Sequence, residues 1–543
     1  MDEQFDYIIV GAGSAGCVLA NRLTADGSRR VLLLEAGPVD SSPWVHMPMG
    51  YYKTIFDPRL GWGYQAEPDA ATGDRPITWT RGRLLGGSSS INGMIYIRGQ
   101  REDYEGWKAA GNPGWGWDDV LPYFKKSEDW RRGPSPLHGS GGELTVSDPW
   151  ARDPMCDVCI NAAEQVGLPR NDDFNGATQE GVGYYQHTVR NGRRCSAAKA
   201  FLAPARGRAN LKILTEALVG RVLIENGRAV GVEYRHDGRV QRATARAEVL
   251  LSGGVINSPQ LLQLSGIGPA EVLRAQGIEI KHASPDVGRN LQDHYNVYFQ
   301  YACKEPITWN MSSRGLGWKA MAGLKYLLGT GPLTMGAGVS GGFAATDPQS
   351  GRPDVQLFFI PYSTDPATGR LHGFSGFTFA FLQIRPESRG YLEIRSADAQ
   401  AAPAIHARYL TDSRDIETVL RAARLAEKIV AAPALQPYLL RPIDPAQPLN
   451  DDDMIAFIRK NGRTGFHPVG TCRMGSDERA VVDPSLRVNG VAGLRVIDAS
   501  VMPTLVSGNT NAATIMIAEK AAALVLQGEK QAAESSRIAT LEV

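Results

Sequence analysis

A short glycine-rich stretch near the N-terminus has the residue spacing needed to bind the phosphates of a dinucleotide. It reads Gly11-Ala12-Gly13-Ser14-Ala15-Gly16, and Glu35 follows further along the chain. In such a stretch Gly11 permits a tight turn, Gly13 lets a pyrophosphate approach the backbone, and Gly16 lets a helix pack closely on a strand. The N-terminus of that helix offers unpaired N–H groups to phosphate. A carboxylate at Glu35 can accept hydrogen bonds from both ribose hydroxyls.

The residues around these glycines predict the elements that must hold them in place. Tyr7–Val10 is a short apolar run typical of a strand, and the spacing of Val18, Leu19 and Leu23 indicates a helix. A second apolar run, Val31–Leu34, ends directly before the acid. Strand, glycines, helix, strand and acid in this order predict a βαβ unit that binds an adenine dinucleotide, either NAD or FAD.

Length and composition indicate a globular protein with more than one domain. The chain has 543 residues, of which 43% are hydrophobic and 21% charged, and a length of this order favours two domains. The formal net charge of +1 gives no long-range reason to bind nucleic acid or an anionic membrane. The sequence offers no expectation about the oligomeric state.

The two ends of the chain indicate the cellular location of the protein. The first expected strand begins within a few residues of Met1, which leaves no room for a signal peptide. We expect no transmembrane segment, because the best apolar stretch, Ala512–Leu526, is interrupted by Glu519-Lys520. These features predict a cytoplasmic protein and leave peripheral membrane association open.

The cysteines do not predict metal or disulfide chemistry. Six cysteines in a chain of this length do not form a disulfide framework. Cys156 and Cys159 form a CxxC, but no second CxxC or histidine pair accompanies them and the flanking pattern is helical. We interpret them as two packed side chains and expect no metal site.

The pattern along the chain changes in the middle. Strands are expected at Leu211–Leu214, Ala229–Tyr234 and Glu248–Leu251, with a helix at Ser258–Leu264. Residues 305–460 differ, because they combine strand patterns with a long amphipathic helix. These expected elements are Val355–Ile360, Phe377–Ile384, Gly390–Ile394 and the helix from Asp415 to Ala431. That mixture favours an antiparallel sheet that carries helices and covers a ligand pocket.

The α/β pattern returns at the C-terminal end, with a strand at Arg495–Asp498 and a terminal helix after Asn511. The fold class is therefore α/β and α+β, with a Rossmann-like dinucleotide-binding domain built from separate pieces of chain. We assign residues 1–155, 190–304 and 461–543 to that domain, and residues 156–189 and 305–460 to a substrate-binding domain.

Six motifs in a fixed order carry a family resemblance. They are GAGSAGCVLANRL near the N-terminus, RGRLLGGSSSIN (81–92), GGVINSPQLLQLSGIG (253–268), VGRNLQDH (287–294), FHPVGTCRMG (466–475) and GNTNAATIMIAEKAA (508–522). With them the chain resembles the glucose–methanol–choline (GMC) oxidoreductases, FAD enzymes that oxidise alcohols. The resemblance is greatest to the branch of choline-dehydrogenase-like enzymes and alcohol dehydrogenases.

The resemblance implies FAD as the cofactor and assigns its binding residues. These are Gly11, Gly13, Ser14, Ala15, Gly16, Glu35, Ala36, Arg83, Gly86, Gly87, Asn92, Gly93, Met94, Ile95, Val219, Asp498, Ala499, Asn511 and Ala512. Some relatives attach FAD covalently through a histidine in the glycine–serine loop. Ile91 occupies that position here, so we expect non-covalent FAD.

Oxidation of an alcohol requires a base, because the hydroxyl proton must leave as hydride passes to flavin N5. Among the nine histidines, His467 matches the catalytic base of the family, and Asn511 matches the partner position that binds the substrate oxygen. We interpret His294 as a loop-stabilising residue near the substrate entrance. Asn509 is interpreted as a loop residue or a cap of the terminal helix, with a catalytic role as the less favoured alternative.

The predicted function is FAD-dependent oxidation of a small-molecule alcohol, primary and either aliphatic or aryl, to the aldehyde. The predicted electron acceptor is a quinone or another non-oxygen acceptor. An alcohol oxidase that reduces oxygen to hydrogen peroxide is the close alternative, and an FAD-containing hydroxynitrile lyase is a remote one.

Overall fold

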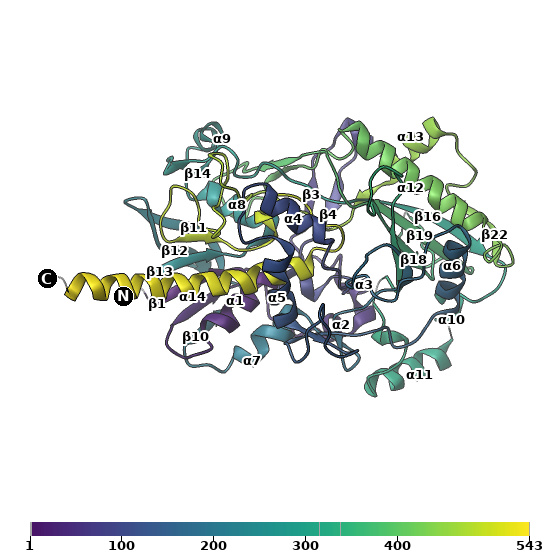
Figure 1. The fold of residues 1–543 in the computed structure, drawn as a ribbon, viewed down its shortest axis with the longest axis horizontal. Coiled ribbons are helices and arrows are strands. Elements are labelled where there is room, and N and C mark those ends of the chain that lie inside the picture. Colours follow the sequence, from purple (N-terminus) through teal and green to yellow (C-terminus); the bar gives the residue numbers. More distant parts are fainter. Residues whose placement is uncertain (1–2, 314, 337, 367, 542–543) are drawn as a thin grey trace.

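The computed structural model describes residues 3–313, 315–336, 338–366 and 368–541, without the side chains of residues 532–541. Within these ranges two seven-stranded sheets stand at opposite ends of the molecule, and loops and short helices connect them (Figure 1). Among the described helices none is both long and apolar enough to cross a bilayer.

The first sheet contains the expected βαβ unit. Its parallel part has the order β10 (Leu211–Leu214), β2 (Val31–Leu34), β1 (Glu3–Val10) and the end of β13 (Arg239–Leu251), and β24 (Leu494–Val496) also pairs with β13. The first half of β13 pairs antiparallel with β12 (Arg228–His236), which pairs with β11 (Leu218–Glu225). Because β24 joins a strand nearly 250 residues earlier (Val249 pairs with Leu494), the dinucleotide-binding sheet is discontinuous, as the sequence predicted.

Helices cover the first sheet and close its core. Helix α1 (Ser14–Leu23) packs against α14 (Asn511–Leu541), and α8 (Gly254–Leu264) packs against β11. The yellow α14 runs beside α1 and α5 (Trp117–Ser127) across the molecule (Figure 1). The apolar residues of β1 and β2 are almost fully buried under these helices, which explains their near-continuous hydrophobic sequences.

The second sheet is antiparallel throughout. Its order is β22 (Leu439–Asp444), β16 (Tyr295–Cys303), β19 (Gly376–Gln383), β18 (Val355–Ile360), β17 (Ser340–Ala344) and β7 (Gly181–Tyr184), and β23 (Arg463–Thr464) pairs with β16. Helix α12 (Ser413–Ala431) packs on β19. An antiparallel sheet that carries helices is the architecture that the sequence predicted for this part.

The two faces of the second sheet differ in what they contact. On β16, side chains at 297, 299 and 301 join the core beneath α12, and those at 296, 298 and 300 line a cavity. The same alternation places Phe379 and Phe381 of β19 in the core and Ala380 and Leu382 at the cavity. Alternate residues of one strand point to opposite faces, so a single sheet supplies both the core and the cavity wall.

The expected domain boundaries need correction at β16 and β23. Residues 190–304 and 461–543 were assigned to the dinucleotide-binding domain, but β16 is an interior strand of the second sheet and β23 pairs with it. The apolar alternation of residues 295–303 predicts a strand without indicating which sheet it joins. Helix α6 (Pro154–Gln165), which carries Cys156 and Cys159, packs on the second sheet with both thiols buried and unpaired.

The other elements are short and connect or cover the sheets. They are α2 (Pro43–His46), η1 (Pro48–Gly50), α3 (Tyr51–Thr54), β3 (Tyr64–Ala66), η2 (Ala70–Thr72), β4 (Ile77–Trp79), η3 (Gly87–Ser90), α4 (Arg101–Ala109), β5 (Glu128–Trp130), β6 (Leu144–Val146), β8 (Val189–Arg190), β9 (Arg193–Arg194), η4 (Ala198–Leu202), α7 (Ala203–Ala205), β14 (Ile267–Gly268), α9 (Ala270–Ala275), β15 (His282–Ala283), α10 (Trp309–Ser312), α11 (Leu316–Leu327), η5 (Pro332–Thr334), β20 (Tyr391–Glu393), β21 (Ala404–His406), α13 (Asp451–Asn461) and η6 (Ala499–Val501).

Candidate active site

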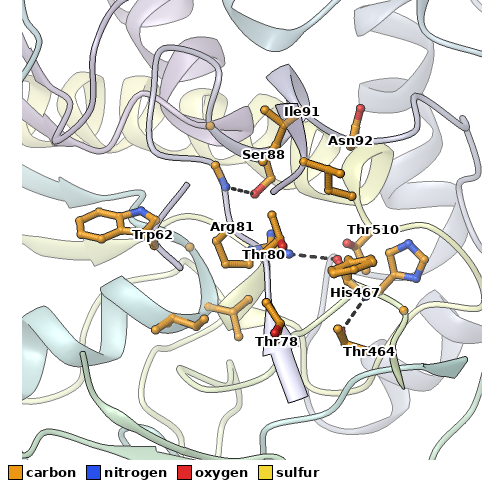
Figure 2. Close-up of a pocket in the computed structure, with 18 of the residues that line it drawn as sticks. Trp62, Thr78, Thr80, Arg81, Ser88, Ile91, Asn92, Thr464, His467 and Thr510 are labelled. Carbon is orange, nitrogen blue, oxygen red and sulfur yellow. Dashed lines mark hydrogen bonds between the residues drawn. The ribbon is translucent and has the colours of Figure 1, made fainter. Parts of the chain in front are cut away.

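A cavity of about 930 Å³ extends from the start of α1 to the second sheet. Residues of the glycine-rich stretch line one end, and residues of β16, β18 and β19 line the other. Figure 2 shows part of the region between these ends, where Arg81 lies between Trp62 and His467 and Ile91 lies beside Ser88. The cavity therefore joins the predicted dinucleotide site to the predicted substrate domain.

The glycine-rich turn supplies backbone to the first end of the cavity. Gly11, Gly13, Ser14 and Ala15 line it where β1 ends and α1 begins. Gly11 has a φ of +98°, and a Cβ atom there would lie 2.5 Å from the carbonyl oxygen of Ser252. Gly13 precedes the helix, and no side chain caps the first N–H groups of α1. This geometry leaves those N–H groups available to a phosphate.

The carboxylate of Glu35 is buried at the same end. Its Oε2 accepts the N–H of Ala12 (2.9 Å) and its Oε1 accepts the N–H of Gly37 (2.9 Å). Burial raises its pKa to about 7, although these backbone N–H groups favour the charged form. Each carboxylate oxygen can accept a further hydrogen bond. Glu35 and Ala36 both line the cavity, so the acid stays accessible to ribose hydroxyls.

Most of the other predicted cofactor residues reach the cavity. The lining includes Gly87, Asn92, Gly93, Met94, Ile95, Val219, Asp498, Ala499 and Asn511.

Four predicted cofactor residues do not line the cavity. Gly16, Arg83, Gly86 and Ala512 lie behind the wall. A Cβ atom at Gly16 would lie 1.9 Å from the carbonyl oxygen of Gly11, so this glycine is required for packing. Arg83 supports the wall, because its Nε donates to the carbonyl of Ala36 (3.3 Å) and its guanidinium lies 5.0 Å from the ring centroid of Trp62.

The residues present fit an adenine dinucleotide with a flavin. Uncapped N–H groups, a side-chain-free turn and a ribose-binding acid meet at one end of the cavity. Asp498, near the middle, accepts the N–H of Gly254 (2.9 Å) and the hydroxyl of Ser258 (2.6 Å), and it fixes the start of α8 against β24. Ile91 lines the cavity with an aliphatic side chain, which cannot form a covalent bond to a flavin.

A short strained turn presents His467 to the cavity. Residues 465–469 run antiparallel to residues 292–294, with Gly465 N donating to His294 O (2.6 Å) and Val469 N donating to Gln292 O (2.9 Å). Phe466 has a φ of +63°, a conformation that costs free energy in a residue other than glycine. The N–H of His467 donates to the buried carboxylate of Asp293 (2.8 Å). The backbone is therefore held on both sides of the histidine.

The hydrogen bonds of His294 determine which ring nitrogen of His467 carries the proton. Nε2 of His294 lies 3.1 Å from the carbonyl oxygen of Ile384, and because a carbonyl only accepts, this nitrogen carries the proton. Burial lowers the pKa of His294 to about 3, so its Nδ1 is an unprotonated acceptor at neutral pH. Nδ1 of His467 lies 3.0 Å from that acceptor and must donate. Nε2 of His467 consequently carries a lone pair.

An amide chain faces that lone pair from the other side. Nδ2 of Asn509 donates to His467 Nε2 (2.8 Å), and Oδ1 of Asn509 accepts Nε2 of Gln356 on β18 (3.1 Å). Gln356 thereby fixes which end of the amide points at the histidine. His467 and Asn509 both line the cavity, so an unprotonated nitrogen and an N–H donor lie side by side at its wall.

The partner of His467 is Asn509, and the sequence-based prediction of Asn511 is corrected here. Oδ1 of Asn511 accepts the hydroxyl of Ser14 (2.7 Å) at the start of α1, which places this amide at the dinucleotide end. The two asparagines are separated by one residue at the beginning of α14, so their side chains diverge. The hydrogen bonds of Asn509 to His467 and Gln356 correct its interpretation as a loop or helix-cap residue and favour the alternative of a catalytic role.

His294 also differs from its predicted role. It is fully buried in direct contact with His467, and it does not lie at an entrance. Gln356 and Arg81 are two further residues of the site that the sequence did not indicate. Nothing in the sequence around Gln356 sets it apart from other strand residues, because its importance comes from facing residue 509 across the fold.

Electrostatics keep His467 neutral. Its pKa lies well below 6.5, first because it is buried, and then because His294 and the guanidinium of Arg81 oppose a positive charge. Arg81 donates from Nη1 to the carbonyl oxygen of Phe466 (3.0 Å), the contact drawn as a dashed line beside His467 (Figure 2). His467 therefore stays unprotonated even in mildly acidic solution, so its free nitrogen is available as an acceptor.

The substrate end of the cavity is mainly apolar. Phe358 and Ile360 of β18 and Ala380 and Leu382 of β19 form one wall. Tyr51 and Tyr362 also line it, joined by a hydrogen bond between their hydroxyls (2.7 Å). Ile95, from the glycine–serine segment, faces the same space. An apolar wall that faces His467, with polar and charged side chains on other parts of the lining, suits a small organic alcohol.

Comparisons with known proteins agree with this geometry. The GMC oxidoreductase family models match residues 5–296 and 386–518. The chain is 45% identical to an alcohol dehydrogenase [acceptor] of Pseudomonas putida, covering 96% of both chains. It is 44% identical to the mitochondrial choline dehydrogenase of Homo sapiens, covering 96% of this chain and 90% of that protein.

Solved structures lead to the same family. The structure of pyridoxine 4-oxidase from Mesorbium loti superposes with a TM-score of 0.87 at 34% identity, over 95% of this chain and 98% of that one. The two family models together match more than half of the chain, at both ends of the cavity. The chain therefore belongs to the GMC oxidoreductases, FAD-binding flavoproteins, and it is an oxidoreductase that acts on CH–OH donors.

Proposed function

We propose that this protein oxidises a neutral primary alcohol, aliphatic or aryl, to the aldehyde, and passes the electrons to a quinone or another non-oxygen acceptor. The observation that carries the proposal is the lone pair on His467 Nε2 beside the N–H of Asn509, both at the wall of the cavity and facing its apolar side. This pair can remove a hydroxyl proton and stabilise the oxygen that loses it.

The residues act on the alcohol in a defined way. A hydroxyl group that enters between the two side chains donates its proton to Nε2 of His467, and its oxygen accepts the N–H of Asn509. His294 keeps Nδ1 of His467 protonated, so the proton can go only to Nε2. Gln356 keeps the amide N–H turned toward the reacting oxygen. His467 and Asn509 are the proposed catalytic residues, and His294 and Gln356 are positioning residues.

The dinucleotide end holds the cofactor for this reaction. The start of α1 would bind the pyrophosphate, Glu35 would bind the adenosine ribose, and Asn92–Ile95 would line the site between α1 and His467. Non-covalent FAD, when bound, supplies the acceptor for the hydride that leaves the alcohol carbon.

A neutral substrate fits the charges at the substrate end better than a quaternary ammonium alcohol does. A cation needs an aromatic cage with a nearby acid. Here the guanidinium of Arg463 already lies 5.7 Å from the ring centroid of Tyr298, so a protein cation occupies that aromatic face. The charged residues that line this end are Arg75, Arg81, Arg463, Asp365 and Asp444, which gives no excess of negative charge.

Anaerobic reduction of the bound flavin tests the proposal. FAD-loaded protein is mixed without oxygen with a panel of primary alcohols, with choline and with sugars, and the absorbance of oxidised flavin is followed. We expect bleaching by aliphatic or aryl alcohols. His467→Ala should slow it by about 10²–10⁴-fold, the usual contribution of a general base, while FAD stays bound.

The same experiment separates the alternatives. Readmitted air should restore the colour slowly and a quinone should restore it fast, whereas fast recovery in air identifies an oxidase. Bleaching by choline alone would contradict the neutral substrate. A loss of less than about tenfold in His467→Ala would reject His467 as the base, and no bleaching by any alcohol would reject the proposed reaction.

A further inference from the structure

Helix α11 carries an apolar face that no part of the described chain covers. Its exposed apolar side chains include Leu316 (84% exposed), Leu324 (63%) and Leu327 (78%), and Leu328 directly after the helix is 74% exposed. Ala322, on the opposite side, is buried. Residues three or four positions apart share one side of a helix, so these leucines form a continuous outward stripe. Figure 1 shows α11 at the lower edge of the molecule, projecting from the second sheet.

The charged side chains of the segment that contains α11 have one sign. Residues 306–346 contain three basic residues and no acidic residue. Lys319 is exposed on α11, and Lys325 in its last turn has its ammonium group 5.5 Å from the ring centroid of Trp150. Arg193 is exposed on β9, and the turn between β8 and β9 packs closely on Gly329, just after α11. Basic side chains thus lie beside the leucines, although the whole chain has a net charge of only +1.

Exposed aromatic residues lie near the same helix. Trp150, beside Lys325, is 45% exposed, and Trp44 on α2 is 41% exposed with the ammonium of Lys53 3.6 Å from its ring centroid. Tryptophan is enriched at the level of the lipid headgroups in membrane proteins. Aliphatic side chains on a projecting helix, with lysines beside them, are characteristic of helices that lie in that interface.

This surface is connected to the entrance of the cavity. Tyr52 and Phe56 are partly exposed and also line the cavity, so they mark its mouth at α3. Helix α3 contacts η1, η1 contacts η5, and η5 packs on α11. The mouth and the leucine stripe are therefore linked by a short series of packed turns.

We propose that α11 docks on the surface of an anionic lipid bilayer, with its leucine stripe inserted among the acyl chains and Lys319, Lys325, Lys53 and Arg193 at the headgroups. A helix of 12 residues lies on a bilayer and cannot cross it. Docking places the mouth at α3 near the lipid, where apolar alcohols and quinones dissolve. That last consequence rests on the proposed function, and the docking itself does not.

Vesicle binding by the FAD-loaded full-length protein tests the docking. Co-sedimentation is measured with vesicles of phosphatidylcholine and with vesicles of equal parts phosphatidylcholine and phosphatidylglycerol. We expect binding to the anionic vesicles that weakens in 0.5 M salt. Leu324→Gln combined with Leu327→Gln should weaken it by at least about tenfold, since each leucine loses its burial in lipid. Glutamine is a good helix former, so α11 is retained.

Matched controls separate docking from general surface effects. Val240→Gln on β13 and Leu440→Gln on β22 change side chains of similar exposure (63% and 57%) and should leave vesicle binding unchanged. Lys319→Gln combined with Lys325→Gln should remove the preference for anionic vesicles. Flavin bleaching by a short-chain alcohol should be equal in all these variants, which shows that they are folded.

Three outcomes would overturn the docking. They are no preference of the wild-type protein for anionic vesicles at low salt, equal losses in the stripe and control variants, and a concentration-dependent dimer that the stripe variant abolishes, which would identify a second copy as the partner. A protein that binds vesicles and is never bleached by an alcohol would reject the proposed function alone.

Discussion

The two ends of the cavity are built in different ways. At the dinucleotide end, one continuous stretch, residues 10–36, supplies both the turn before α1 and the acid Glu35. At the catalytic end, the side chains of His294, Gln356, His467 and Asn509 come from four separate segments and are joined by hydrogen bonds. The first end depends on local backbone conformation, and the second depends on the packing of the two sheets.

This difference predicts that mutations at the two ends fail in different ways. A change in the cradle should remove the cofactor and with it every activity. A change in the catalytic corner should leave the cofactor bound and slow one step.

The largest effect is expected for Gly11→Ala. The residue has a φ of +98°, and the new methyl group would lie 2.5 Å from the carbonyl oxygen of Ser252, so the turn beneath the pyrophosphate must move. We expect nearly complete loss of bound FAD, measured as flavin absorbance per protein after gel filtration, and loss of all activity.

Gly27→Ala is the matched control for that change. Gly27 also has a positive φ (+78°), but a Cβ atom there meets nothing within 4 Å. It should cost about 1 kcal/mol of stability and keep its FAD. Full FAD content in Gly11→Ala would show that the cradle does not depend on this turn.

The same difference explains what the sequence could predict. The elements that the sequence predicted well are those that a local residue pattern determines. They are the glycine-rich turn, the strands Leu211–Leu214, Val31–Leu34 and Val355–Ile360, and the long helix α12. Motif resemblance also identified His467, which lies at the cavity with its Nε2 lone pair facing Asn509.

The partners of His467 could not be predicted in the same way. Asn509 and Asn511 are alike in residue type and separated by a single residue, and only the direction in which α14 begins decides which one meets the histidine. Gln356 and His294 acquire their roles from the juxtaposition of β18, β16 and the turn at Phe466. The domain boundary at β16 was missed for the same reason, since strand pattern does not reveal sheet membership.

A comparison of Asn509→Ala with Asn511→Ala sharpens the distinction between the two ends. Asn509→Ala removes the N–H that faces the reacting oxygen, so we expect flavin reduction to slow by about 10²–10³-fold, as for loss of one oxyanion donor, with FAD affinity unchanged. Asn511→Ala removes the acceptor for the Ser14 hydroxyl and should weaken FAD binding with a much smaller effect on the reduction rate.

Stopped-flow reduction under anaerobic conditions and FAD titration of the apoprotein measure these two effects. The reverse result, a slow step in Asn511→Ala and weak FAD binding in Asn509→Ala, would restore the assignment that the sequence suggested and would contradict the geometry found here.

The smallest expected effect is a shift in pH dependence. His467 must be unprotonated to act as a base, so the rate falls as pH drops through its pKa, which lies well below 6.5 because of burial, His294 and Arg81. Arg81→Gln removes a positive charge that opposes protonation, so the pKa of His467 should rise. The acid limb of the flavin-reduction rate should then move to higher pH by up to about one unit.

Arg75→Gln is the matched control, because Arg75 also lines the cavity but does not contribute to the pKa of His467. It should leave the acid limb in place. A limb that stays fixed or moves to lower pH in Arg81→Gln would show that the charge of Arg81 does not help to set the pKa of His467. In that case the proton affinity of His467 would depend on how the two sheets pack around it and not on the charge of Arg81. The hydrogen bond from Arg81 to the carbonyl of Phe466 would then hold the turn in place without tuning the histidine.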